Sequence, residues 1–194
     1  MRGFPEPPRI GYTMGMIRTL ILLAALCPFA ALCPNSASAQ QPTRTDVAAQ
    51  QAASLFVASC VAYAGDPAGL RAWAGKIGLP ALPDPGQAGF LKGAAGKVFD
   101  ASNPAGKYVV ISHDEGGCFI LAEAVNTAEL VRAAEAALAT AAINAVLDGD
   151  RADLGDTGMR HRNYHAALGQ RSWTMVISYG PGQPDQAMLS AVAR

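Results

Sequence analysis

Four cysteines and three histidines are the residues of this chain best suited to do chemistry, and their spacing limits what that chemistry is. Cys60 and Cys118 have no third cysteine beside them and form no Cys-x-x-Cys pair, which argues against a zinc site and a thioredoxin-like motif. The two remaining alternatives are a reactive thiol, which requires a nearby base, and a disulfide, which requires an oxidising compartment.

The histidines are too widely spread for an obvious metal site. His161 and His165 are four residues apart, a metal-binding spacing on a helix, but about 13 Å apart if the segment is a strand. His113 precedes Asp114-Glu115 at a turn, without a visible nucleophile or oxyanion motif. We therefore predict no bound metal and no cofactor. His113, His161 and His165 stay as the candidates for the alternative, a small metal-assisted or hydrolase-like enzyme.

Residues 1–39 contain the three parts of a secretory signal peptide. Arg18 precedes an apolar run from Leu20 to Leu32, and a small-residue site ends at Ala39. The run is too short to span a bilayer, which needs about 20 apolar residues. We expect cleavage after Ala39, a polar tether over residues 40–45, and a periplasmic or secreted protein with no stable membrane span.

Two features of this leader leave alternatives open. Residues 1–15 lie outside the signal pattern, so we expect an over-extended start, with Met14 or Met16 giving a more compact signal. Cys27 and Cys33 raise the option of a lipid anchor, but each follows a leucine, where lipid attachment normally requires a small residue. We therefore favour the cleaved, unlipidated form.

Export changes the interpretation of the two remaining cysteines. An even pair in an oxidising compartment predicts a disulfide between Cys60 and Cys118. Closing a loop of that length stabilises the fold by about 4 kcal/mol in the chain-entropy model.

Composition excludes some partners. The 194 residues include 15 basic and 15 acidic side chains, so the chain has no electrostatic footprint for nucleic acid. The leader is basic, and its removal leaves a faintly acidic protein without a polybasic membrane patch. The hydrophobic share of 51% argues against disorder.

The N-terminal part predicts helices. Leu55, Ser59 and Tyr63 form a helical stripe that places Cys60 on a buried face, in a helix capped by Asp46 and ended by Gly65. Asp66-Pro67 begins a second helix, and residues 87–92 read as a third, short one.

The middle of the chain predicts strands at Val98 to Asp100, Lys107 to His113 and Cys118 to Ala124. Asp114-Glu115-Gly116-Gly117 joins the last two as a hairpin whose apolar faces indicate a central place in a sheet. If Cys118 is bridged to Cys60, the first helix must pack on the Ile120 face.

The C-terminal part predicts one long helix from Thr127 to about Val146, capped by Asn126, and an acidic loop over residues 148–156. Met159 to Leu168 and Arg171 to Tyr179 form a second hairpin around Gly169-Gln170. Residues 181–184 break the strand, and residues 186–192 read as a short helix. The hairpin register assigns to a core face Tyr164, Trp173, Met175, Ile177 and Tyr179. It assigns to the opposite, polar face His161, Asn163, His165, Thr174, Val176 and Ser178.

These elements predict a single α+β domain over residues 46–194, in which N-terminal helices pack on a roughly five-stranded antiparallel sheet with one long helix, in β-β-β-α-β-β order. With no reactive constellation visible, we expect a non-catalytic binding or envelope accessory module. Its partner would be an envelope protein or a small molecule.

One motif carries a family resemblance. The motif is Glu115-Gly116-Gly117-Cys118-Phe119-Ile120-Leu121-Ala122-Glu123, followed by a capped helix and by Arg171-Ser172-Trp173-Thr174. In this motif the chain resembles a family of small exported bacterial proteins or lipoproteins of no assigned function. The resemblance covers about residues 55–179. It implies an envelope location and transfers no catalytic residue.

Overall fold

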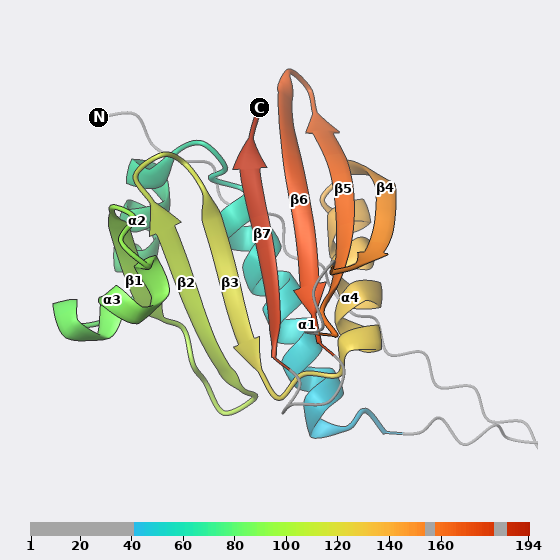
Figure 1. The fold of residues 1–194 in the computed structure, drawn as a ribbon, viewed down its shortest axis with the longest axis horizontal. Helices are drawn as coiled ribbons and strands as arrows, with labels where there is room; N and C mark the ends of the chain where they lie inside the picture. Colours follow the sequence, from blue (N-terminus) through green and yellow to red (C-terminus); the bar gives the residue numbers. More distant parts are fainter. Residues whose placement is uncertain (1–40, 154–157, 181–185) are drawn as a thin grey trace, which may run out of the picture. The chain divides into compact units, whose positions relative to one another are not determined.

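The computed structural model describes residues 41–153, 158–180 and 186–194 (Figure 1). The signal peptide predicted at 1–39, with Cys27 and Cys33, and the strand break predicted at 181–184 lie outside the described residues. Gln40–Arg194 forms one compact unit. In the described ranges, no helix has the length and apolar character needed to cross a membrane.

The predicted N-terminal helices are present. Helix α1 (Arg44–Phe56) is capped by Thr43, in a capping box with Asp46 as its third residue; the prediction of Asp46 as the cap was wrong. The helix thus takes in the last two residues of the predicted tether. It continues as the π-helical turn η1 (Val57–Val61), which carries Cys60.

Two short helices follow at the β1 end of the sheet. Helix α2 (Pro67–Lys76) is capped by Asp66 and has Pro67 in its first turn, as predicted. Helix α3 (Asp84–Leu91) ends at Lys92, which adopts the left-handed conformation at φ 48°.

Seven antiparallel strands form one sheet, in the order β1-β2-β3-β7-β6-β5-β4. The α+β class is confirmed, but the sheet has two strands more than expected, and β-β-β-α-β-β-β-β replaces the predicted order. The strands are β1 (Gly96–Asp100), β2 (Lys107–His113), β3 (Cys118–Glu123), β4 (Asn144–Ala152), β5 (Arg160–Leu168), β6 (Arg171–Tyr179) and β7 (Ala187–Ala193).

The additional strands replace a predicted helix end, a predicted loop and a predicted helix. Helix α4 (Thr127–Thr140) is shorter than predicted, because Ala142 adopts a left-handed conformation at φ 56° that stops the helix. Strand β4 then occupies residues predicted as helix and acidic loop. Strand β7 replaces the predicted C-terminal helix, since pairing with both β3 and β6 overrides the helix preference of its alanines, methionine and leucine.

Helices α1 and α4 cover one face of the sheet, behind it in Figure 1. Four of the five buried residues of α1 are alanines, whose small side chains let the helix approach both α4 and the sheet closely. The predicted packing of the first helix on the Ile120 face is confirmed, because a disulfide joins Cys60 in η1 to Cys118 in β3, with the two Cα atoms 5.1 Å apart. We call this the covered face and the opposite side, on which α3 packs only at the β1 end, the uncovered face.

Glycines at the disulfide end permit a close approach of two backbones. Gly65 donates its N–H to the carbonyl of Gly116, and a Cβ atom on Gly116 would lie 3.1 Å from the Gly65 Cα atom. Both glycines have positive φ angles, 78° and 90°, that other residues rarely adopt. The pair brings the end of the first helical segment to the β2–β3 turn.

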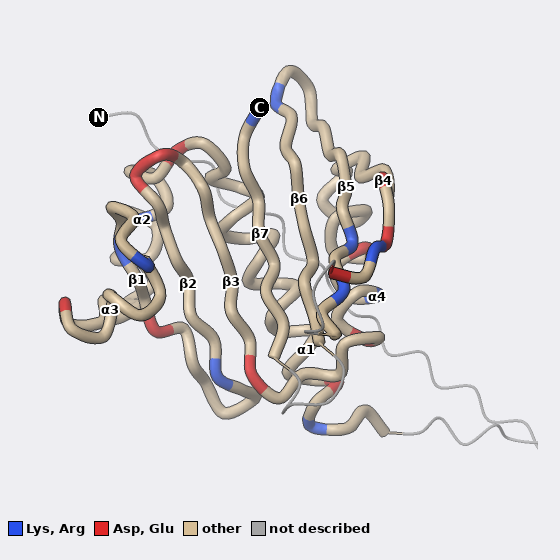
Figure 2. The backbone as a smooth tube through the Cα atoms, in the orientation of Figure 1, with Lys and Arg blue, Asp and Glu red and all other residues tan. Residues whose placement is uncertain are grey.

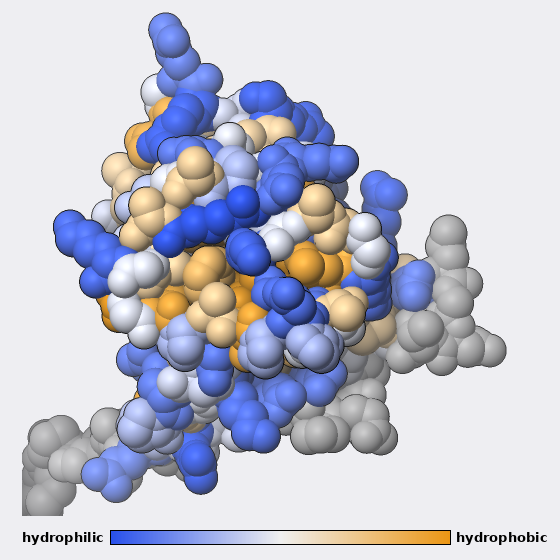
Figure 3. Space-filling view, turned by 90° about the vertical axis from the view of Figure 1, so that its left-hand side faces the viewer, coloured by the Kyte–Doolittle hydropathy of each residue, from blue (hydrophilic) through white to orange (hydrophobic). Residues whose placement is uncertain are grey.

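The two edges of the sheet differ. At β1, residues 80–82 pair with the strand, and the buried Gln87 side chain accepts a hydrogen bond from the Val98 N–H (3.1 Å) and donates one to the Leu82 carbonyl (2.8 Å). Figure 3 views this side and shows apolar side chains gathered between hydrophilic ones. At β4 no strand of the described residues pairs with the outer edge, and Val146 is 55% exposed.

Candidate functional site

The β5–β6 hairpin separates its residues between the two faces of the sheet as predicted. Tyr164 pairs with Met175 and Ala166 with Trp173, which confirms the two-residue turn at Gly169-Gln170. On the uncovered face, His161 is opposite Ser178, Asn163 opposite Val176 and His165 opposite Thr174. These polar side chains are half-buried, except for Ser178, which is buried.

The three candidate histidines do not converge. His113 lies on β2, four strands from β5 and so about 19 Å away, where its ring packs against Phe119 at 4.8 Å between centroids. His161 Nδ1 is 2.8 Å from Ser178 Oγ, and His165 Nε2 contacts the Asp148 carboxylate. In the part of the chain that the structure describes, no three His, Cys, Asp or Glu side chains are grouped so that they could hold a metal ion.

A β-bulge in β4 brings Asp148 to His165. Leu147 is opposite Tyr164 and Gly149 is opposite Asn163, so Asp148 is an extra residue between two ladder pairs. Gly149 is at an uncovered-face position, and the Asp148 carboxylate reaches His165 across the same face. The bulge therefore places the Asp148 carboxylate beside Gly149, a position that has no side chain.

This bulge borders a shallow depression of about 290 Å³ on the uncovered face. Arg194 reaches it from the end of β7, and its Nε donates to Thr174 Oγ1 at 2.6 Å. Arg151 reaches it from β4 and lies over Gly149, with its Nε 3.4 Å from where a Cβ atom would be. The lining residues are Asp148, Gly149, Arg151, Asn163, His165, Thr174 and Arg194.

No known protein helps to identify this site. No protein-family model matches the chain, and no curated protein or solved structure is significantly similar to it. The resemblance to small exported proteins therefore stays a prediction.

The rest of the uncovered face is mainly apolar. Strands β2, β3 and β7 carry there a group of half-buried or buried apolar side chains, namely Val109, Ile111, Phe119, Leu121 and Met188. Figure 2 shows that charged residues lie mainly at strand ends and on β4 and β5, while the middle of β3, β7 and β6 has none. The depression thus lies where an apolar surface meets the charged edge.

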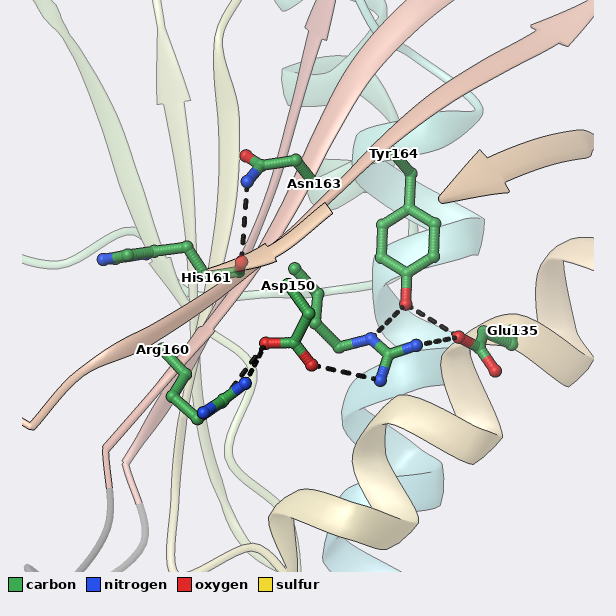
Figure 4. A network of polar contacts seen from close by, with 7 residues as sticks. Glu135, Asp150, Arg160, His161, Asn163 and Tyr164 are labelled. Atoms are coloured by element: carbon green, nitrogen blue, oxygen red, sulfur yellow. Dashed lines mark hydrogen bonds and ion pairs between the residues drawn. The ribbon is translucent and has the colours of Figure 1, made fainter. Parts of the chain in front are cut away.

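A second polar cluster lies on the covered side of the same strands (Figure 4). The Tyr164 hydroxyl donates to Glu135 Oε1 of α4 at 2.8 Å and accepts from Arg162 Nε at 3.0 Å. Burial, and then the hydrogen bond to Glu135, raise the pKa of Tyr164 to about 12. Asp150 accepts from Arg162 (3.4 Å) and from Arg160 (2.8 Å). Because each of these groups is already engaged, we interpret the cluster as structural, joining α4 to the β4–β5 edge.

The sequence predicts His165, Asn163 and Thr174 on a polar face but does not indicate Asp148, Arg151 and Arg194 as their neighbours. It places Asp148 in a loop and residues 186–192, just before Arg194, in a helix. The local signal that could have found the bulge is Asp148-Gly149-Asp150, a glycine between charged residues near the end of an apolar run.

Proposed function

We propose that the protein is an exported, non-catalytic binding or envelope accessory module that engages its partner with the uncovered face of the sheet. The observation that carries this proposal is the difference between the faces: α1 and α4 bury one, whereas the other bears a polar depression beside an apolar surface. Support for export comes from the predicted signal peptide and from the disulfide, a bond typical of oxidising compartments.

The enzyme alternative loses the arrangement on which it depended. It required His113 to act with His161 and His165, and His113 lies four strands away. His161 and Ser178 are in contact, but no hydrogen bond from the second ring nitrogen to an acidic group accompanies them among the described residues. A serine–histidine pair normally needs such an orienting group.

Export is tested by the intact mass of the protein recovered from the periplasm or medium. We expect a mature chain that begins at Gln40, without acyl chains and with both thiols oxidised. A mass that retains the apolar run 20–32, or a free thiol at Cys60 or Cys118, contradicts the proposed compartment.

The binding face is tested by photo-crosslinking in cells. A photoreactive residue at Val192, 44% exposed on the uncovered face, should give adducts, and native mass spectrometry should detect a small ligand if the partner is not a protein. The matched control is Ala136, exposed on α4, which should give none. Equal adducts at both positions, or neither adduct nor ligand, contradict the proposed binding face.

A further inference from the structure

We propose that the depression beside the β4 bulge is a binding site for a small oxyanion, either a carboxylate or a phosphate, held by Arg151 and Arg194. This inference rests on the proposed function, because it places a ligand on the uncovered face. The side chains around the depression support such a ligand by their direction, their pairing and their charge.

Arg194 is held in place by two hydrogen bonds, but not all of its hydrogen-bond donors are used. Its backbone N–H donates to the Ser172 carbonyl at 3.0 Å, and its Nε donates to Thr174 Oγ1 at 2.6 Å. Both contacts fix the guanidinium at the rim of the depression. Its terminal nitrogens have no hydrogen-bond acceptor within the described ranges, so their donors are available to a ligand.

Arg151 is available in the same way. It has no ion-pair partner in the portion of the chain described, whereas four other arginines are each paired with a carboxylate: Arg71, Arg132, Arg160 and Arg162. Its side chain lies over Gly149, where a Cβ atom would be in van der Waals contact with the Arg151 Nε atom at 3.4 Å. Arg151 therefore borders the depression from the side opposite Arg194.

The charges around the depression favour an anion. The lining contains one carboxylate side chain, Asp148, which contacts His165, and two guanidinium groups, neither of which contacts a carboxylate side chain of the described residues. A guanidinium presents a planar fork of donors that matches carboxylate and phosphate oxygens. The Asn163 side chain, also in the lining, supplies a neutral amide.

A metal cation is the competing ligand for these residues. Asp148 and His165 could provide two ligands, but zinc sites have three or four protein ligands, and both neighbouring charged side chains are positive. The two ligands respond in opposite ways to removal of the Asp148 charge, which makes that substitution decisive.

The test is calorimetric titration of the mature, disulfide-bonded protein with citrate, with inorganic phosphate and with Zn²⁺, at constant ionic strength because exposed charges are screened by salt. We expect saturable 1:1 binding of citrate or phosphate. Arg151→Gln and Arg194→Gln should each weaken it at least tenfold, as expected for the loss of a charge-assisted hydrogen bond. Asp148→Asn should strengthen it severalfold, and all variants should keep the wild-type melting temperature.

The matched control is Arg132→Gln, which removes the same charge from an exposed position on α4 and should leave binding within twofold. Binding that Arg132→Gln weakens as much as Arg151→Gln, or no saturable binding of either anion, would overturn the proposal. Zinc binding lost on Asp148→Asn would also overturn it and make the site a cation site. If anion binding fails while adducts at Val192 persist, only this inference fails; if both fail, the proposed function fails with it.

Discussion

The two faces of the β5–β6 hairpin are built from alternate residues of the same strands, yet they obey different physical rules. On the covered face, Tyr164, Trp173, Met175 and Ile177 are each 1–3% exposed. On the uncovered face, the polar residues opposite one another are half-buried, apart from the buried Ser178, and their side chains contact polar groups, His161 that of Ser178 and His165 that of Asp148. Shape and volume therefore determine the residues of the covered face, whereas charge and hydrogen bonding determine those of the uncovered face.

The strongest effect should come from the largest side chain of the covered face. Trp173→Ala should lower the free energy of unfolding by about 3–5 kcal/mol, since a fully buried aromatic ring is replaced by a cavity. Urea denaturation of the mature protein measures the loss. Trp73→Ala, at a half-buried position on α2, is the control and should cost less. A tolerated Trp173 change would show that the two faces are assigned the wrong way round.

The disulfide should give the next largest effect, because it ties η1 to the covered face of β3. It closes a loop of 58 residues, and its loss should cost about 2–5 kcal/mol. Cys60→Ala and Cys118→Ala should destabilise the protein equally, and the double variant should be little worse than either. Additive losses in the same denaturation experiment would falsify the bridge.

Tyr164 should make the covered face sensitive to alkaline pH. Its pKa is about 12 in the folded chain and about 10 when unfolded, so the fold favours the protonated phenol. The resulting stabilisation is complete below pH 10 and is lost as pH rises towards 12, by about 2–3 kcal/mol. Tyr164→Phe, which cannot ionise, should show a shallower decline over this range, measured by chemical denaturation at several pH values. Parallel curves for the two proteins would contradict the assignment.

The smallest effects belong to the uncovered face. His161→Ala and His165→Ala should each change the free energy of unfolding by no more than about 0.5 kcal/mol, because neither side chain fills the core. Losses as large as that of Trp173→Ala would show that this face also supports the fold.

The two hairpins were predictable because the residues that determine them are close together in the sequence. Two β-rich runs around Gly169-Gln170 alternate with period two, and a single turn then determines which residues share a face. The disulfide was predicted from the expected compartment rather than from geometry. Both predictions needed no knowledge of distant strands.

Strands β4 and β7 were not predictable in this way. Strand β4 is an edge strand with Asp150 towards the covered side and Arg151 on the other, so it shows no clean alternation. Strand β7 is built from residues that favour helix, and only its place between β3 and β6 makes it a strand. The candidate site requires both, since Arg151 lies on β4 and Arg194 directly follows β7, and only the pairing of distant strands brings them to one depression.

The central claim is that ligand binding belongs to the uncovered face and stability to the covered one. The most direct measurement is an NMR titration of the ¹⁵N-labelled mature protein with citrate and with phosphate, following side-chain signals. We expect shifts in the Nε–H signals of Arg151 and Arg194 and in the Asn163 side-chain amide, with the indole N–H of Trp173 unchanged. Shifts confined to Trp173, or equal on both faces, would contradict the account.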